Sequence, residues 1–328
     1  MAGPLVYDRG FSNNVIGDVD SNIKQAIISQ LDSNYVVINT TWIEYDQHLQ
    51  SVLDSTKTAV CYSGPDWENT NCIDIRKEAH SAILKNSKSV VHIGNTRGPN
   101  YFNYWAEFIR QNLNGFLNPA YTVEPEFTKL YMCLNRKPHN HRLFLVDLLE
   151  NNHLINNGHV SIHRDRNPLF LKENLSDIVE LGDNAVSDSI GIKNDIVSLG
   201  DPAYWNSHFL NIVTETTVHT DVFISEKTWK PIIGLRPFLI LGDYNIYNQL
   251  HEIGIDTFDD LFGTWYTDPN WESRARSIVN IIQDYKTKNL NKIYKKIKYR
   301  LDRNRECFLD FTVNNIRRLK NEISFRKI

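Results

Sequence analysis

Short apolar runs alternate with stretches of helical spacing along the first 115 or so residues. Residues 35–39, 58–62 and 89–93 are rich in β-branched and aromatic side chains and precede polar or glycine residues, which is typical of buried strands. Helical spacing of apolar residues marks 23–31 and 72–85, between these runs. Strands that alternate with helices predict a parallel sheet covered on both faces.

A second series of the same kind begins after residue 128. Strand-like runs occupy residues 129–134, 160–163, 210–215 and 237–241, and helical spacing marks residues 140–153 and 247–253, whereas a helical stretch at 104–113 belongs to the first series. Gly254 is typical of a helix end, and Asp268 with Pro269 is typical of the N-cap and first position of a further helix.

Residues 114–128 interrupt both series with glycine, proline and asparagine and no periodicity. We therefore expect an α/β fold of two Rossmann-like domains that face a cleft, at residues 1–117 and 128–280. Residues 281–328 are expected to form a basic helical tail. In open parallel sheets ligands bind beyond the carboxyl ends of the strands, so strand ends and helix starts are the positions to examine.

Composition excludes several classes of protein. The apolar fraction of 41% and the charged fraction of 23% are ordinary for a globular chain. No apolar run approaches the roughly 20 residues that span a bilayer, and the first residues lack the pattern of a signal peptide, so we expect a cytoplasmic protein without integral membrane association. The four cysteines are scattered and form no CxxC pair, which argues against a disulfide framework or a zinc site.

Charge is unevenly distributed along the chain. Residues 281–328 carry 14 Lys and Arg against 5 Asp and Glu, a local charge of +9 in a chain whose net charge is −3, so the remaining residues carry −12. A basic tail on an acidic body indicates an anionic partner such as nucleic acid or a lipid surface, or simply a solvated helix face.

The most informative segment is residues 223–242, which contains a helix start between two predicted strands. Ser225 or Thr228 is a candidate N-cap, and a helix N-terminus attracts phosphate. Lys227 and Lys230 would add positive charge against a diphosphate. Taken alone, the pattern fits a capped surface helix with solvated charges equally well.

Ser225-Glu226-Lys227 is followed by Trp229 and Pro231, and then by Pro237, four apolar residues and Gly242. This arrangement resembles the donor-binding segment of GT-B glycosyltransferases of the fucosyltransferase-like superfamily, strongly over residues 210–262. It is also similar to phage and bacterial proteins of that superfamily. The resemblance implies that Glu226 contacts the ribose or sugar of a nucleotide-sugar donor and that Lys227 contacts its diphosphate.

Two further strand ends are candidate donor-binding positions. Asn135 and Arg136 end the strand at 129–134, and the planar fork of an arginine suits a phosphate oxygen, although an arginine there could instead pair with a nearby acid. Glu215 ends the strand at 210–215 and could bind sugar hydroxyls or cap a loop.

No convincing DxD-type metal motif stands at a strand end, the nearest acids being Asp165 and Asp259 with Asp260. The expected transfer is therefore metal-independent, with Lys, Arg and the helix dipole neutralising the leaving diphosphate, and needs no cofactor besides the nucleotide-sugar cosubstrate.

An acceptor hydroxyl needs a general base in an inverting reaction. Asp66 and Glu68 follow a predicted strand of the first domain and are the candidates, although each also fits a solvated loop. Tyr101, Tyr104 and Trp105 are candidates to stack on the acceptor, although at helical spacing some of them must belong to the core.

The sequence thus favours a glycosyltransferase, with Lys227 and either Asp66 or Glu68 as catalytic residues. The acceptor hydroxyl is left open between a glycan and a hydroxymethylated base in phage DNA, in which case the protein would act in the host cytoplasm. One alternative is a glycan or lipopolysaccharide transferase on a membrane surface. The other is a scaffold that binds the nucleotide without catalysis.

Overall fold

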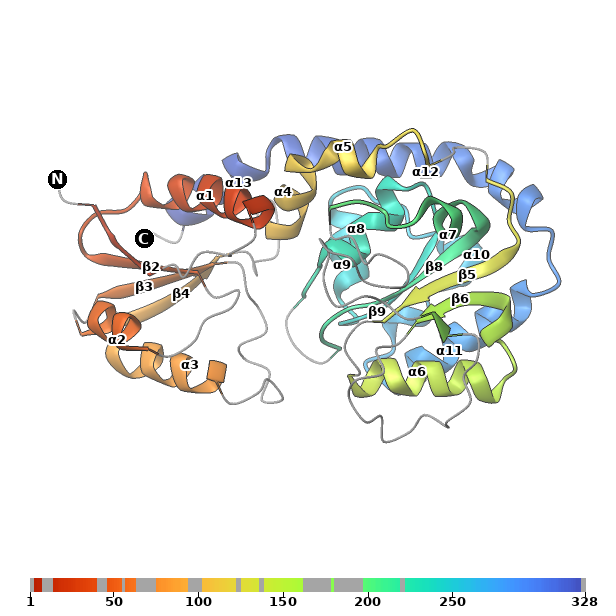
Figure 1. Ribbon diagram of the computed structural model, residues 1–328, viewed down its shortest axis with the longest axis horizontal. Helices are drawn as coiled ribbons and strands as arrows, with labels where there is room; N and C mark the ends of the chain where they lie inside the picture. The colour runs from red at the N-terminus through yellow and green to blue at the C-terminus, as the bar shows by residue number, and fades with distance from the viewer. Residues whose placement is uncertain are drawn as a thin grey trace. The chain divides into compact units, whose positions relative to one another are not determined.

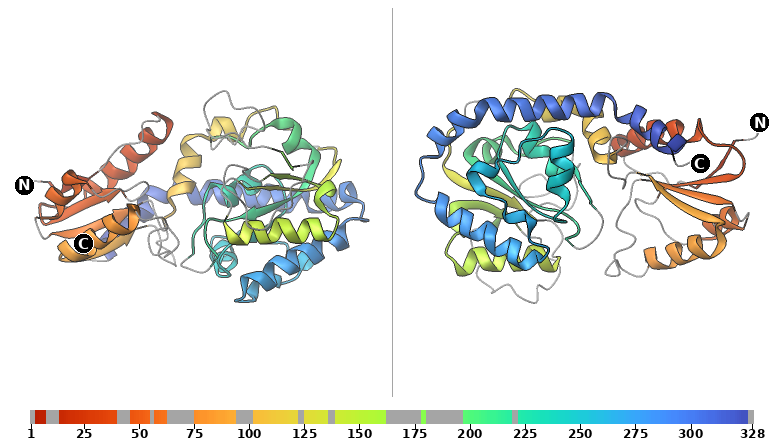
Figure 2. Two further views of the ribbon diagram at one scale, coloured as in Figure 1. Left: turned by 60° about the horizontal axis from the view of Figure 1, so that its bottom comes forward. Right: turned by 180° about the vertical axis from the view of Figure 1, so that it is seen from behind.

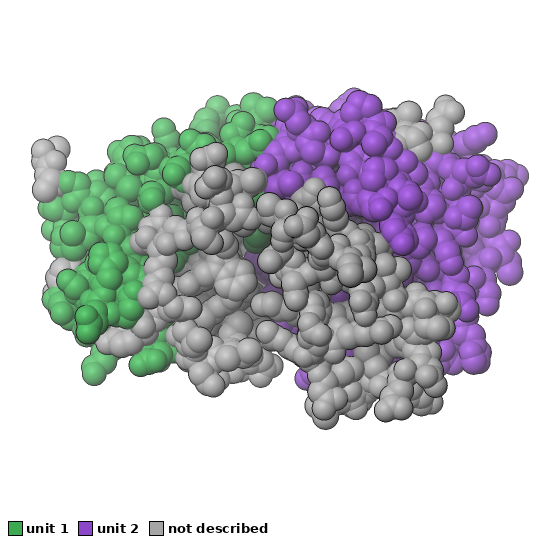
Figure 3. All heavy atoms as spheres, in the orientation of Figure 1, with its two compact units in different colours: residues 1–111, 311–328 green, residues 112–310 purple. Residues whose placement is uncertain are grey.

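The computed structural model describes residues 3–7, 14–39, 46–54, 57–62, 75–93, 102–121, 125–135, 139–161, 178–179, 197–218 and 222–325. The chain has the expected α/β fold with parallel sheets. Packing divides it into two compact units: unit 1 comprises residues 1–111 and 311–328, and unit 2 comprises residues 112–310 (Figure 3). The domain limits given above for residues 1–117, 128–280 and 281–328 stay a prediction.

Unit 1 contains a parallel sheet in the order β1-β2-β3-β4. Its strands are β1 (Leu5–Tyr7), β2 (Tyr35–Asn39), β3 (Thr58–Tyr62) and β4 (Ser89–Ile93). The last three are the strands predicted from their apolar runs, whereas β1 is too short to leave a periodic signal. This order follows the chain without a reversal among the strands that the structure describes, so it differs from the strand order of a classic Rossmann sheet.

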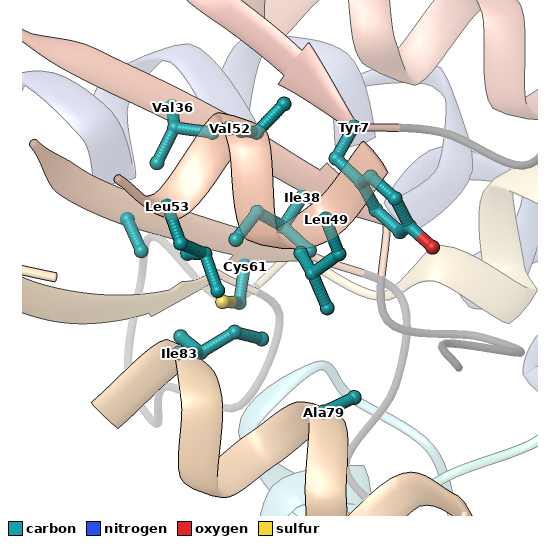
Figure 4. Close-up of a cluster of buried hydrophobic side chains, with 10 residues drawn as sticks. Tyr7, Val36, Ile38, Leu49, Val52, Leu53, Cys61, Ala79 and Ile83 are labelled. Carbon is teal, nitrogen blue, oxygen red and sulfur yellow. The ribbon is translucent and has the colours of Figure 1, made fainter. Parts of the chain in front are cut away.

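Helices cover both faces of this sheet, with α1 and α13 above it and α2 and α3 below it in Figure 1. They are α1 (Asn14–Ile28), α2 (Gln47–Leu53), α3 (Ile75–Asn86), α4 (Tyr104–Gln111) and α13 (Asn315–Phe325). The register pairs Val36 with Ala59 and Ile38 with Cys61, so alternate residues of β2 and β3 face α2 and α3. There they form a core closed by Leu49 (Figure 4).

The C-terminal helix completes unit 1. The helix α13 contacts α1, α4 and β4. Asn315 and Asn103 hold it through a reciprocal pair: the backbone N of Asn103 donates to Asn315 Oδ1 (3.2 Å), and Asn315 Nδ2 donates to the carbonyl of Asn103 (2.9 Å). Leu319 and Ile323 of this helix are buried.

Unit 2 contains a parallel sheet in the order β7-β6-β5-β8-β9. Its strands are β5 (Lys129–Leu134), β6 (Gly158–Ser161), β7 (Ile178–Val179), β8 (His208–Thr214) and β9 (Phe238–Leu241). The chain builds outward from β5 to one edge and then returns to add β8 and β9 on the other side, as in a doubly wound sheet. The point of reversal lies between β5 and β8.

The helices of unit 2 lie on both faces of its sheet, with α6 and α11 on one face and α8 and α12 on the other (Figures 1 and 2). They are α5 (Leu113–Phe116), α6 (Asn140–Asn151), α7 (Pro202–Ser207), α8 (Glu226–Ile233), α9 (Ile246–Glu252), α10 (Asp259–Phe262), α11 (Trp271–Tyr285) and α12 (Leu290–Val313). Within the described residues, none of the helices combines the length and apolar character that a bilayer crossing requires.

The start of α11 differs from the prediction. Asn270, not Asp268, is the N-cap, and its side chain accepts from the backbone N of Ser273. Asp268 instead accepts from the backbone N of Asn270 (2.8 Å) in the turn before the helix. The prediction was wrong because Asp-Pro is favoured in turns as well as at helix starts. β6 also begins two residues before the predicted strand at 160–163, whose last two residues lie outside the described part.

All of α12 lies within the basic tail, and Tyr294, Ile297 and Leu301 are buried along one side of the helix. Arg300 binds two carboxylates, that of Asp256 in the loop after α9 and that of Asp260 in α10. Its guanidinium donates to Asp256 (2.5 and 2.8 Å) and to Asp260 (2.7 and 3.0 Å). Part of the positive charge of the tail is therefore neutralised within unit 2.

We expect the contribution of Arg300 to stability to depend on pH. Burial raises the pKa of Asp256, but hydrogen bonds from Arg300 outweigh it and hold that pKa below its usual value. A carboxyl group whose pKa is lower in the folded than in the unfolded protein stabilises the fold at pH values above its unfolded pKa of about 4. This stabilisation is lost as the pH falls through the pKa of the folded state. Thermal unfolding of wild type and Arg300→Gln should therefore differ by about 1 kcal/mol near neutral pH, with the difference shrinking in acid.

Arg303→Gln is the matched control, since Arg303 is exposed on the same helix. It should leave stability unchanged at every pH. If the difference in the free energy of unfolding between wild type and Arg300→Gln stays constant from neutral pH into acid, the stability does not depend on the ionisation of Asp256 and the prediction is wrong.

Candidate functional site

The reversal of strand order in unit 2 defines a candidate site at the carboxyl ends of β5 and β8. These two strands are neighbours. The helices that follow them, α6 and α8, cover opposite faces of the sheet (Figure 1). The chain segments that follow β5 and β8 therefore pass to opposite faces of the sheet, which leaves the strand ends between them exposed. In doubly wound sheets ligands bind at this point.

Asn135 joins three strands at this edge. Its Oδ1 accepts from Thr214 Oγ1 at the end of β8 (2.6 Å), and its Nδ2 donates to the carbonyl of Ser161 at the end of β6 (3.2 Å). Asn135 is 1% exposed. The structure therefore gives the side chain of Asn135 a role in fixing the strand ends, whereas the sequence predicted a donor contact.

Glu215 follows β8 directly and is fully buried. One carboxylate oxygen accepts from the backbone N of Ser225 (3.0 Å) and from Thr228 Oγ1 (2.6 Å). The other accepts from Ser225 Oγ (2.6 Å). Both oxygens are thus occupied at the start of α8, so Glu215 anchors that helix to the sheet, and its contact with sugar or ribose hydroxyls stays a prediction.

The backbone of Glu215 is held from the other side of the site. Its carbonyl accepts from His141 Nε2 (2.8 Å) and from the guanidinium of Arg142 (3.2 Å), which also reaches the carbonyl of Thr214 (3.1 Å). Both side chains are buried near the start of α6. Sequence reasoning missed them, and their only signal is a pair of polar residues at the first turn of an otherwise apolar helix.

Ser225 is the N-cap of α8, as predicted, and its Oγ accepts from the backbone N of Lys227. The ammonium of Lys227 lies 2.9 Å from Glu226 Oε1 and 3.2 Å from Ser225 Oγ. Burial raises the pKa of Glu226, but the charges of Lys227 and Lys230 and the hydrogen bond from Lys227 hold it below its usual value. Glu226 is therefore a carboxylate paired with Lys227.

The first amide groups of α8 do not all remain available for phosphate. The amide of Ser225 is bonded to Glu215 and that of Lys227 to Ser225 Oγ. The expectation of a helix end with free N–H donors is therefore corrected. The charges of two carboxylates, Glu215 and Glu226, also balance those of Lys227 and Lys230. What the site offers an anion is the ammonium of Lys227, whose side chain is 32% exposed, together with the positive end of the helix dipole.

The predicted acceptor residues that the structure describes lie on α4 of unit 1. Tyr104 is 5% exposed and packs edge-to-face against Trp105, which itself contacts Phe108. Tyr104 is thus a core residue, and Trp105 is half-buried. Asp66, Glu68, Tyr101 and Arg136 lie outside the described residues.

No protein-family model and no curated protein matches the chain. Among solved structures the chain is similar to one titled "Crystal Structure of alpha1,3-Fucosyltransferase". The two share 10% sequence identity over 93% of this chain and 90% of that chain, with a TM-score of 0.44.

Proposed function

We propose that the protein is a glycosyltransferase that moves a sugar from a nucleotide-sugar donor to a hydroxyl acceptor, with the donor diphosphate at the start of α8. The observation that carries the proposal is the position of this helix start: it lies at the reversal point of the sheet, is fixed there by Glu215, and presents Lys227 to solvent. The resemblance of Ser225-Glu226-Lys227 to the donor-binding segment of fucosyltransferase-like enzymes supports the same assignment.

The chemistry follows from an exchange of partners. In the free protein Lys227 is paired with Glu226. Donor hydroxyl groups that hydrogen-bond to Glu226 release Lys227 to the diphosphate, so the helix start recognises both parts of the donor. Negative charge grows on the leaving diphosphate as the glycosidic bond breaks, and a cation beside it stabilises the transition state more than the ground state. We propose that this replaces a metal ion, so that EDTA leaves turnover unchanged.

A thermal-shift screen against nucleoside diphosphates and nucleotide sugars tests the proposal, because a ligand that binds only the native state raises its apparent stability. We expect at least one nucleoside diphosphate to stabilise wild type and to lose most of this effect with Lys227→Ala. Absence of any shift across the panel would contradict a donor site. Release of free sugar from the donor without acceptor would distinguish an enzyme from a scaffold that only binds nucleotide.

An anionic acceptor is favoured by the outer face of α12. Lys292, Lys295 and Lys296 are exposed there together with Tyr299, which is 70% exposed, whereas Lys298 is paired with Asp302. Exposed lysines beside an aromatic ring suit a nucleic-acid backbone with stacking on a base. A hydroxymethylated base in phage DNA is therefore our proposed acceptor, and a glycan on an anionic membrane surface is the alternative.

Replacement of Lys292, Lys295 and Lys296 by Gln should weaken acceptor binding and leave donor binding unchanged. Each lost phosphate contact lowers the slope of log affinity against log salt by about 1. Titration of DNA and of anionic liposomes at several salt concentrations measures this slope and separates the two acceptors. Lys298→Gln is the matched control variant and should leave the slope unchanged, because the charge of Lys298 is already paired with Asp302 within α12. Equal salt slopes for wild type and the triple variant would rule out the basic face as an acceptor site.

A further inference from the structure

A second cavity lies in unit 2, at the opposite end of α8 from the candidate donor site. It has a volume of about 450 Å³, within the range of small-molecule sites. Its lining comes from three separate parts of the unit: the segment from Phe116 to Tyr121, the end of α8 at Ile233 to Leu235, and Arg305 of α12. Leu199 closes a further side.

Much of the cavity wall is apolar, and Asn118, Tyr121 and Arg305 supply its polar side chains. Phe116, Leu199, Ile233 and Leu235 are buried around it, and Leu117 stands at its edge with 42% of its surface exposed. Contact with an apolar ligand would remove the exposed surface of Leu117 from water, which is favourable. The lining thus favours a ligand whose body is hydrocarbon.

Within the described part of the chain, the charge of Arg305 is balanced only in part, by the nearby carboxylate of Asp302. Arg305 makes no hydrogen bond or ion pair with the described residues, and its Nε is buried without an acceptor. The carboxylate one turn earlier, Asp302, has both oxygens 2.6 Å from Lys298. Burial lowers the pKa of Arg305, although Asp302 and Tyr294 act in the opposite direction. A half-buried guanidinium whose Nε lacks an acceptor gains a hydrogen-bond partner when a ligand supplies a carboxylate.

A second guanidinium adds to the positive potential at this end of the unit. Arg236 is fully buried, and it donates to the carbonyls of Leu235 (3.1 Å) and Trp205 (3.0 Å) instead of to a carboxylate. The positive charge of Arg305 lies near enough to lower its pKa further, after burial itself, to about 10. The two guanidinium groups, those of Arg305 and Arg236, together favour an anionic ligand in the cavity.

The wall is also held rigidly before any ligand arrives. Leu235 has φ of 57°, a left-handed conformation that is uncommon for leucine. Its carbonyl is fixed by Arg236 and by the hydroxyl of Tyr294 (3.1 Å). Gly234 packs so closely on Trp205 that an added Cβ would lie 2.1 Å from the indole ring. Such a preformed wall loses little entropy on binding.

We propose that this cavity binds a small amphiphilic carboxylate, with its carboxylate on the fork of Arg305 and its apolar chain against Phe116, Leu117 and Ile233. A guanidinium accepts a carboxylate bidentately, which gives the head group both charge and orientation. The site is separate from the donor site, and binding there does not require Lys227.

Isothermal titration calorimetry with hexanoate tests the proposal, with hexanamide, acetate and inorganic phosphate as comparison ligands. Hexanoate should bind, and hexanamide should bind about tenfold more weakly or worse, because it lacks the charge that meets Arg305. Acetate and phosphate, which lack the chain, should bind much more weakly than hexanoate. If none of the four binds, or if phosphate binds as tightly as hexanoate, the proposal is wrong.

Arg305→Gln should weaken hexanoate binding about tenfold or more, and Arg303→Gln, on the exposed face of the same helix, should leave it unchanged. Leu117→Asp provides a second variant at an exposed position, where the new charge repels an anion without disturbing the core. Equal hexanoate affinity in wild type, Arg305→Gln and Leu117→Asp would overturn the assignment. If Arg305→Gln does not fold, the result with Leu117→Asp decides.

Discussion

Lys227→Ala should fold normally, bind the donor more weakly and lose turnover by a factor on the order of 10² to 10³, by analogy with the loss of one oxyanion donor. Lys227 is the partly exposed cation at the start of α8, and among the described residues its amine contacts Glu226 and Ser225. Its removal takes away positive charge that the transition state needs more than the ground state does. Steady-state kinetics at saturating donor measure the effect.

Three variants sharpen this test. Lys227→Arg should recover part of the lost turnover, because a planar fork does not reproduce a point charge on a flexible stem. Glu226→Gln should mainly lower donor affinity, since we assign that carboxylate to donor hydroxyl groups. Lys292→Ala removes an exposed lysine of α12 and should leave donor kinetics unchanged. Wild-type turnover in Lys227→Ala would mean that the donor site lies elsewhere.

Glu215→Ala should produce the largest loss of stability among the variants considered. Three donor groups, from Ser225 and Thr228, would be left without their acceptor in a fully buried position. Each buried unsatisfied donor costs about 1–3 kcal/mol, so we expect a loss of about 3–5 kcal/mol after partial relaxation. Thermal unfolding measures the loss, and faster hydrogen exchange at the amides of Ser225 and Lys227 would locate it at the helix start.

Glu215→Gln distinguishes the loss of anchoring hydrogen bonds from the loss of side-chain volume. It keeps the shape of the side chain but offers one acceptor oxygen instead of two, so stability should fall by about 1–3 kcal/mol. Donor affinity should fall with it, because the helix start loosens. Glu252→Gln changes an exposed carboxylate of α9 and serves as the control. Unchanged exchange at Ser225 in Glu215→Gln would contradict the anchoring role.

Much of the fold could be predicted from the sequence because its strands are buried on both faces. Continuous apolar runs such as Tyr35–Asn39 and Lys129–Leu134 are confirmed as strands with those bounds. Strands β1 and β7, with 3 and 2 residues, are too short to produce a period. The order of strands also could not be predicted, because pairing joins segments that are distant along the chain.

The candidate site was predicted only in outline, because its hydrogen bonds also join residues that are distant along the chain. The cap at Ser225 is a local signal, and the structure confirms it. The role of Glu215 depends on hydroxyl groups ten and thirteen residues later, and that of Arg300 depends on acids 44 and 40 residues before it. Polar residues at strand ends look alike in sequence, whether they bind a ligand or fasten a neighbouring helix.

The division of unit 1 between the two ends of the chain has a consequence during synthesis. Residues 1–111 leave the ribosome first, but α13, which buries Leu319 and Ile323 against them, is made only after residues 112–310. At 5–20 residues per second this interval lasts about 10–40 s. Throughout it the surfaces of α1 and α4 that receive α13 are uncovered, and at its end unit 2 already has every segment it needs. Unit 2 should therefore mature first, and the nascent N-terminal region should depend on chaperones until the last helix emerges.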